Sequence, residues 1–259
     1  MYGRARLAAA VVTALFASSF SAHAALVNLA QTITHQVRIQ PIIVSDDGGL
    51  NTAGFFGTPS QKISIEGIID EIWAQAGIDV EFLTARTFNS TFVNVGNVAP
   101  EAVRPTDDIF TVVNDGGDAG VTHLDDAVIN MFFVNKPAGF GELSDNQAAG
   151  LAAVNGNGIM QFVGSNLPTF ENGREVAASV VAHEIGHNLG LVHFDESENL
   201  MQSGGIQPSG ERLNLSQIST ALGSGFAVEV TAVPLPGAVW LLASGLIVLR
   251  VARKQKAAY

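Results

Sequence analysis

The chain has no cysteine, only two tyrosines and few basic residues, and each shortage limits what it can do. Without cysteine it forms neither disulfides nor thiolate metal sites, so a metal ion would have to be held by histidine, aspartate or glutamate. The 13 lysines and arginines are outnumbered by 24 aspartates and glutamates, which gives a formal net charge of −11. This acidity argues against nucleic acid or anionic lipid as a partner of the folded part.

Residues 1–24 have the pattern of a secretory signal peptide. Arg4 and Arg6 precede an apolar run, and Ala22-His23-Ala24 fits an A-x-A cleavage site. A transmembrane anchor is the weaker interpretation, because the apolar run is too short to cross a hydrocarbon layer about 30 Å thick. We therefore expect export, with cleavage after Ala24.

Residues 233–259 form a second terminal signal. The motif Val233-Pro234-Leu235-Pro236 is followed by an uncharged stretch that ends at Leu249, and four cations come after it. The uncharged stretch is just long enough to span a bilayer, and the basic end fits the cytoplasmic side. The alternative is a buried C-terminal helix, which the prolines and the cations disfavour.

This terminal segment resembles the PEP-CTERM sorting signal of bacterial exosortase substrates, in the variant that begins with VPLP. The resemblance implies a Gram-negative host and an exosortase-type processing enzyme as partner. It also implies that the segment engages the membrane before it is cut. The product would then lie at the cell surface, outside the cell or in the outer envelope.

The residues between the two signals, 25–232, are predicted to form one α/β domain. Residues 33–44 are rich in β-branched amino acids and predict a strand that ends at an Asp-Asp-Gly-Gly turn. Within this strand, Pro41 indicates a sheet edge or a bulge, since proline has no N–H to donate to a ladder.

A helix and a second strand follow. Isoleucines recur at helical spacing from Ile63 to Trp73, with Ser60 as the expected N-cap and Gly77 as the stop. Residues 78–83 then alternate like a strand. The order strand, helix, strand predicts a βαβ unit with two parallel strands.

Residues 84–126 are predicted to be mainly loop, because Asp, Asn and Gly clusters punctuate them. Their carboxylates leave two interpretations open. One is that they serve turns and solubility. The other is a calcium (Ca2+) site, although their spacing matches no calcium-loop motif.

The second half of the domain reads more clearly. Residues 128–134 predict a fully buried strand, and Asn155-Gly156-Asn157-Gly158 predicts the turn of a hairpin between strands at 150–154 and 159–163. Residues 173–189 predict a helix that ends at Gly190. The last helix is expected to start at Asn214, with Gln217 completing a capping box.

The chemistry is concentrated in His183-Glu184-Ile185-Gly186-His187. Histidines at i and i+4 share one face of a helix and can bind one metal ion. Gly190 can turn the chain back, so that His193 becomes a third ligand. Three protein ligands leave one position of a tetrahedral zinc (Zn2+) site for water, which is typical of a catalytic site. Glu184 is then placed to act as general base toward that water.

The run from His183 to His193, followed by Asn199-Leu200-Met201, resembles the metzincin zinc metalloproteases, and the step from His193 to Met201 is similar to that of the matrixin branch. The resemblance implies a twisted mixed five-stranded sheet with an active-site helix, a Met-turn and a C-terminal helix. It also implies that Met201 forms a hydrophobic floor beneath the zinc. The implied activity is hydrolysis of peptide bonds in protein or peptide substrates by an endopeptidase.

The sequence departs from some relatives and leaves alternatives open. Tyr2 and Tyr259 are the only tyrosines, so no tyrosine ligand follows the Met-turn, and latency through a cysteine switch is excluded. A catalytically inactive surface or matrix binding module that retains the fold is the main alternative, which the presence of Glu184 disfavours. A purely structural zinc site is a third reading, and it lacks a fourth ligand. The sequence does not indicate substrate specificity, because the glycine-rich residues 204–212 carry no recognisable specificity determinant. Position alone suggests residues 150–153 as an edge strand that pairs with an extended peptide.

Overall fold

The computed structural model describes residues 27–54, 56–95, 105–135, 150–162, 173–203 and 211–230. The predicted signal peptide and the C-terminal sorting segment lie outside these residues, so both remain predictions. Within the described residues, no helix is long and apolar enough to cross a membrane.

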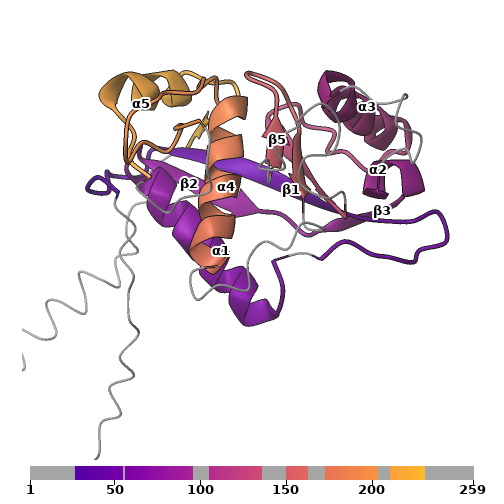
Figure 1. Ribbon diagram of the computed structural model, residues 1–259. Helices are drawn as coiled ribbons and strands as arrows, with labels where there is room; N and C mark the ends of the chain where they lie inside the picture. The colour runs from indigo at the N-terminus through magenta and orange to yellow at the C-terminus, as the bar shows by residue number, and fades with distance from the viewer. Residues whose placement is uncertain are drawn as a thin grey trace, which may run out of the picture.

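A twisted mixed sheet forms the centre of the molecule (Figure 1). Its main path is β2-β1-β4-β6-β5, in which the neighbours are parallel except for the antiparallel pair β5 and β6. Two short strands, β3 and β7, also pair with β1, so the sheet has seven strands where five were predicted. The predicted mixed α/β fold is confirmed. The strands are β1 (His35–Ser45), β2 (Ile78–Phe82), β3 (Arg86–Asn89), β4 (Val128–Val134), β5 (Gly150–Ala152), β6 (Ile159–Phe162) and β7 (Val228–Glu229).

Helices cover both faces of the sheet. On one face α1 (Pro59–Ala74) and α4 (Gly173–Asn188) lie against each other, while α2 (Thr91–Val95) and α3 (Pro105–Asp118) lie together near β3 (Figure 1). Met131 and Phe133 of β4 belong to the core beneath α1 and α4, whereas Phe132 and Val134 belong to the core with α2 and α3. Both faces of β4 are therefore buried, which explains its continuous apolar sequence.

The predicted βαβ unit is confirmed, with one correction at the start of its helix. The N-cap of α1 is Thr58, not Ser60, and Thr58 forms a capping box with Gln61. Pro59 then occupies the first turn, where its missing N–H costs nothing. Gly77 follows the end of the helix, where the stop was predicted; its φ is +70, and a Cβ there would lie 2.8 Å from the carbonyl oxygen of Thr32.

Pro41 lies in the central strand β1, so the interpretation as a sheet edge was wrong. The other predicted interpretation, a bulge, agrees with the strand pairing. Ile39 is paired with Phe82 of β2 and Ile42 with Arg86 of β3, so the partner chain has one extra residue opposite Pro41. The break between β2 and β3 lies at this point. A proline fits here because no partner carbonyl requires its N–H.

The prediction that residues 84–126 are mainly loop was wrong, since β3, α2 and α3 lie there. Two glycines in α3, Gly116 and Gly117, lower the intrinsic helix propensity and gave the appearance of a turn. Gly116 is required by packing, because a Cβ at this position would lie 2.6 Å from Cζ of Phe132 in β4. Burial of Ile109 and Val112 against β4 outweighs the weak propensity.

The remaining elements agree with the sequence. β5 and β6 form the predicted hairpin, with Leu151 opposite Met160. Helix α5 (Leu215–Leu222) starts after Asn214, and both hydrogen bonds of its capping box with Gln217 are present.

Candidate metal centre

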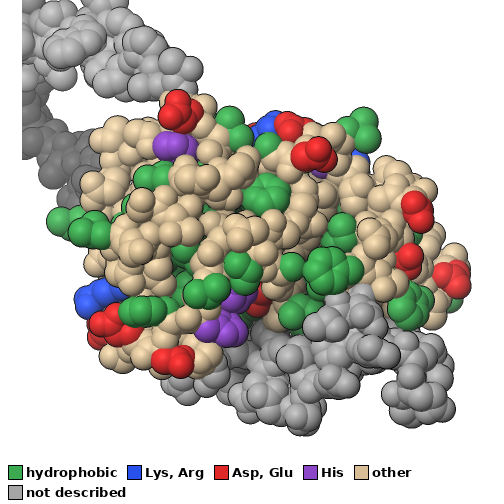
Figure 2. All heavy atoms as spheres, turned by 90° about the horizontal axis from the view of Figure 1, so that it is seen from above, with side chains coloured by type: hydrophobic (Ala, Val, Ile, Leu, Met, Phe, Trp, Pro, Cys, Tyr) green, Lys and Arg blue, Asp and Glu red, His purple; other side chains and the backbone are tan. Residues whose placement is uncertain are grey.

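Three histidines converge at the C-terminal end of α4. His183 and His187 come from the helix and His193 from the loop after it, and each offers a ring nitrogen within 4.8 Å of those of the other two. The ring centroids of the three pairs are 4.7 to 5.3 Å apart. Figure 2 shows a patch of histidine side chains in the lower part of this face, with further histidine atoms elsewhere on the surface.

Gly190 makes the turn that returns the chain to the helix. Its φ of +91 lies in the left-handed region, where glycine has no steric penalty. The next residue, Leu191, donates its N–H to the carbonyl of Gly186, 2.9 Å away, which closes the end of the helix. His193 then follows within reach of the other two imidazoles.

The backbone orients two of the imidazoles. Nδ1 of His183 lies 2.7 Å from the carbonyl oxygen of Leu200, and Nδ1 of His187 lies 2.8 Å from that of Leu191. A carbonyl only accepts, so both Nδ1 atoms carry the proton and both Nε2 atoms keep a free lone pair. Burial lowers the pKa of His183 to about 4 and also lowers the pKa of His187. Both rings are neutral at neutral pH, as a metal ligand must be.

The Met-turn packs beneath this part of the helix. Met201 is fully buried, and a Cβ on Gly186 would lie 2.5 Å from its sulfur, so only glycine allows this approach. Asn199 fixes the turn by accepting the N–H of Met201 at 2.9 Å. Leu200, between them, supplies the carbonyl that orients His183.

Glu184 is the buried acid of the site, with 7% of its surface exposed. Burial raises its pKa to about 8, while the backbone N–H of Ala152 in β5 donates to the carboxylate and acts in the opposite direction. Gly150 of the same strand makes room for it, because a Cβ there would lie 2.7 Å from Cγ of Glu184. The carboxylate is thus held against the edge strand of the sheet.

These residues fit a zinc ion. The donor set consists of three imidazole nitrogens from neutral rings, two of them held through Nδ1, which is the arrangement zinc prefers in catalytic sites. Among the residues that the structure describes, these histidines form the one group of three or more His, Asp or Glu side chains able to hold a metal ion. The calcium site left open by the sequence therefore has no support.

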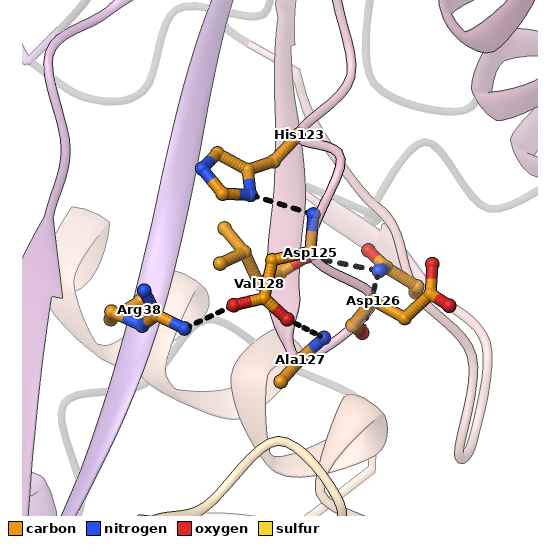
Figure 3. A network of polar contacts seen from close by, with 7 residues as sticks. Arg38, His123, Asp125, Asp126, Ala127 and Val128 are labelled. Carbon is orange, nitrogen blue, oxygen red and sulfur yellow. Dashed lines mark hydrogen bonds and ion pairs between the residues drawn. The ribbon is translucent and has the colours of Figure 1, made fainter.

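One acidic loop serves the fold instead. Asp125 pairs with Arg38 of β1 at 2.6 Å and accepts the N–H of Ala127 at 3.0 Å, while its own N–H donates to Nδ1 of His123 (Figure 3). The N–H of Ala127 and then the Arg38 guanidinium hold the pKa of Asp125 below its ordinary value. This network ties the loop before β4 to the neighbouring strand.

The structure brings together all four residues singled out from the sequence, His183, Glu184, His187 and His193. The sequence did not reveal the residues that hold this site in place. Gly150 and Ala152 contact Glu184, Asn188 contacts the β5–β6 hairpin, and Gln217 contacts Asn199 of the Met-turn. Of these, only Gln217 carried a local signal, the capping box, and that signal did not reveal its contact with the Met-turn.

Comparison with known proteins agrees with this geometry. The family model described as Matrixin, of peptidase family M10, matches residues 70–218, which is more than half of the chain. The chain belongs to the matrixin family. Membership gives it the fold of a zinc-dependent peptidase and implies zinc for the three histidines and peptides or proteins as substrates.

Among solved structures, this matrixin is similar to archaemetzincin from Methanopyrus kandleri, with 14% identity, 72% of this chain and 93% of that chain covered, and a TM-score of 0.48. It is also similar to metalloproteinase-II from Bacteroides fragilis, with 16% identity, 76% and 55% covered, and a TM-score of 0.47. No curated protein matches it in sequence.

Proposed function

We propose that this matrixin is an active zinc-dependent endopeptidase, with Glu184 as general base and His183, His187 and His193 as zinc ligands. The observation that carries the proposal is the position of Glu184. Its carboxylate is buried next to the first histidine and lies against the edge strand β5. A merely structural metal site has no use for a buried acid at this place.

The edge strand supports an extended peptide as substrate. Among the described residues, β5 is the last strand on its side of the sheet, and its one partner is β6. A peptide that adds to this edge would run past Glu184 and the histidines, because Ala152 already contacts that glutamate. Binding in the middle of an extended chain is what distinguishes an endopeptidase.

In this mechanism, a bound zinc ion would lower the pKa of water and polarise the scissile carbonyl. Glu184 accepts a proton from the attacking water as the oxygen bonds to the carbonyl carbon. It then delivers that proton to the nitrogen of the leaving amine as the C–N bond breaks. Burial favours the protonated form that this second step needs, while the positive charge of a bound zinc ion would favour the ionised form that the first step needs.

The direct test is to incubate the purified protein with a peptide library, with and without chelator, and to restore zinc afterwards. Internal cleavage that chelator abolishes and zinc restores is the expected result. A protein with full zinc that cleaves nothing would replace the proposal with the inactive binding module. His193→Ala is expected to lose most of its zinc, whereas His123→Ala, outside the site, is expected to keep it.

We also propose that the chain is exported and that its C-terminal segment is cut by an exosortase-type enzyme after engaging the membrane. The signal-like pattern of residues 1–24 and the VPLP motif, uncharged stretch and basic end of residues 233–259 support this. Mass spectrometry of the mature protein tests it. Termini near Ala25 and within residues 233–236 are expected, and an intact C-terminus at Tyr259 would leave a plain anchor.

A further inference from the structure

Two pairs of residues at i and i+4 share the last two turns of α4. His183 and His187 face each other for the metal, and one residue later Glu184 and Asn188 both face the β5–β6 hairpin. Asn188 is fully buried. Its Nδ2 donates to three carbonyl oxygens of the hairpin turn, at 3.2 Å to Ala153, 2.6 Å to Gly156 and 3.2 Å to Gly158.

The hairpin is held to the helix at three points. Besides the Asn188 amide, the N–H of Asn155 donates to the carbonyl of His187 at 2.9 Å, and the N–H of Ala152 donates to Glu184. Asn155 adopts a left-handed backbone, with φ 59, to make its bond. The hairpin turn is therefore bonded directly to the end of α4 that carries His187.

The edge strand has little other support. β5 has three residues and, within the part of the chain that the structure describes, one neighbouring strand. A strand this short contributes few ladder hydrogen bonds, so its distance from α4 depends on the contacts with the helix itself. Of these contacts, Asn188 is the side chain that reaches the far side of the turn.

The Asn188 side chain is also costly to bury. Its Oδ1 has no hydrogen-bond partner among the described residues, and an unmatched buried acceptor destabilises a fold. An apolar residue at position 188 would avoid the cost of the unpaired acceptor, but it would leave three carbonyl groups of the turn without their hydrogen-bond donor. We therefore interpret the Asn188 amide as a group that holds the hairpin turn in place, and not as one that serves only to fill the core.

We propose that Asn188 is a positioning residue for the peptide substrate. It holds β5 at the distance from the three histidines that lets a peptide lying along this strand present its scissile carbonyl to the metal. The inference rests on the proposed endopeptidase function and deepens it, because it assigns alignment of the substrate to a residue that touches neither metal nor peptide.

The test compares Asn188→Ala with Asn188→Asp, which keeps the shape but loses at least one donor hydrogen, and with Asn188→Ser, which keeps a shorter donor. Asn94→Ala is the matched control, because Asn94 is also fully buried and its Nδ2 bonds the carboxylate of Asp46 and the carbonyl of Asn51, away from the site. Hydrogen exchange, zinc content, KM and kcat are measured on the full chain.

In all three variants at Asn188, we expect faster amide exchange across residues 150–162 and unchanged zinc content. For a long peptide, kcat/KM should fall at least tenfold, chiefly through a higher KM, with Asn188→Ser between the wild type and Asn188→Ala. Asn94→Ala should leave KM unchanged even if it lowers stability. A wild-type KM in the folded variants, or zinc loss in parallel with activity, would overturn the inference. Failure of the wild type to cleave any peptide would instead overturn the proposed function, and this inference with it.

Discussion

Asn199 and Gln217 are joined by two hydrogen bonds between their side-chain amides, 2.9 and 3.0 Å long. Gln217 also accepts the N–H of Asn214 at the start of α5, and Asn199 accepts the N–H of Met201. The cap of the last helix and the Met-turn are therefore one connected network. Through Leu200, which bonds His183, this network extends to the metal site.

Removing the link is expected to loosen the Met-turn. Gln217→Ala leaves the buried Asn199 amide without its partner, so the free energy of unfolding should fall by about 1–3 kcal/mol. Zinc affinity should fall too, because the carbonyl of Leu200 is no longer held in place. Urea unfolding and zinc titration measure both. The exposed neighbour Ser216→Ala serves as control, and equal effects in the two variants would contradict the account.

Gly150 is expected to be essential for activity but not for metal binding. In Gly150→Ala the new Cβ would lie 2.7 Å from Cγ and 3.0 Å from Oε1 of Glu184, so the carboxylate must move. Displacement of a catalytic group by about 1 Å can cost roughly 10²-fold in rate. Peptidase activity should therefore fall while zinc content stays. Gly48→Ala, where nothing lies within 4 Å of the added carbon, is the control, and full activity in Gly150→Ala would argue against this position of Glu184.

Asp70 is expected to make stability depend on pH. Burial raises its pKa from 3.8 to about 6, and Asp79 and Glu66 act in the same direction, although it accepts the N–H of Val80 at 3.0 Å. The folded state binds its proton more tightly than the unfolded state does, so its contribution to stability is present below about pH 4 and is lost as pH rises through about 6.

The corresponding measurement is urea unfolding of the wild type and Asp70→Asn across this pH range. The neutral variant should lose less stability than the wild type between pH 4 and pH 7. Asp118→Asn, which removes an exposed carboxylate at the end of α3, controls for the change in net charge. Parallel pH curves for the wild type and Asp70→Asn would rule out a raised pKa at this residue.

The local parts of this structure were predictable because they depend on spacing within one segment. The i, i+4 histidines, the turn at Gly190 and the capping box of α5 follow from backbone geometry within a few residues. The helix α3 was missed for the opposite reason. Its glycines oppose a helix locally, and only the contact with Phe132 of β4 explains Gly116.

The residues that hold the site in place could not be predicted either, because their contacts are with distant parts of the sequence. The contact between Gly150 and Glu184 joins residues far apart in the sequence, and neither Gly150 nor Ala152 has a local pattern that indicates contact with Glu184. Asn188 follows a histidine of the motif, yet its three carbonyl partners lie in a turn about 30 residues earlier. Such pairings depend on the register of the sheet against α4, which only the structure supplies.

The central claim is that Glu184 is the general base of a zinc peptidase, and Glu184→Gln tests it most directly. The glutamine keeps the size of the side chain but cannot accept the proton, and general acid–base catalysis contributes roughly 10²–10⁴ in rate. Zinc content and peptide hydrolysis are measured on the same sample, with the exposed Glu196→Gln as control. The account predicts full zinc and a loss of kcat by that factor or more in Glu184→Gln alone. Equal hydrolysis by Glu184→Gln and the wild type at full zinc would contradict it.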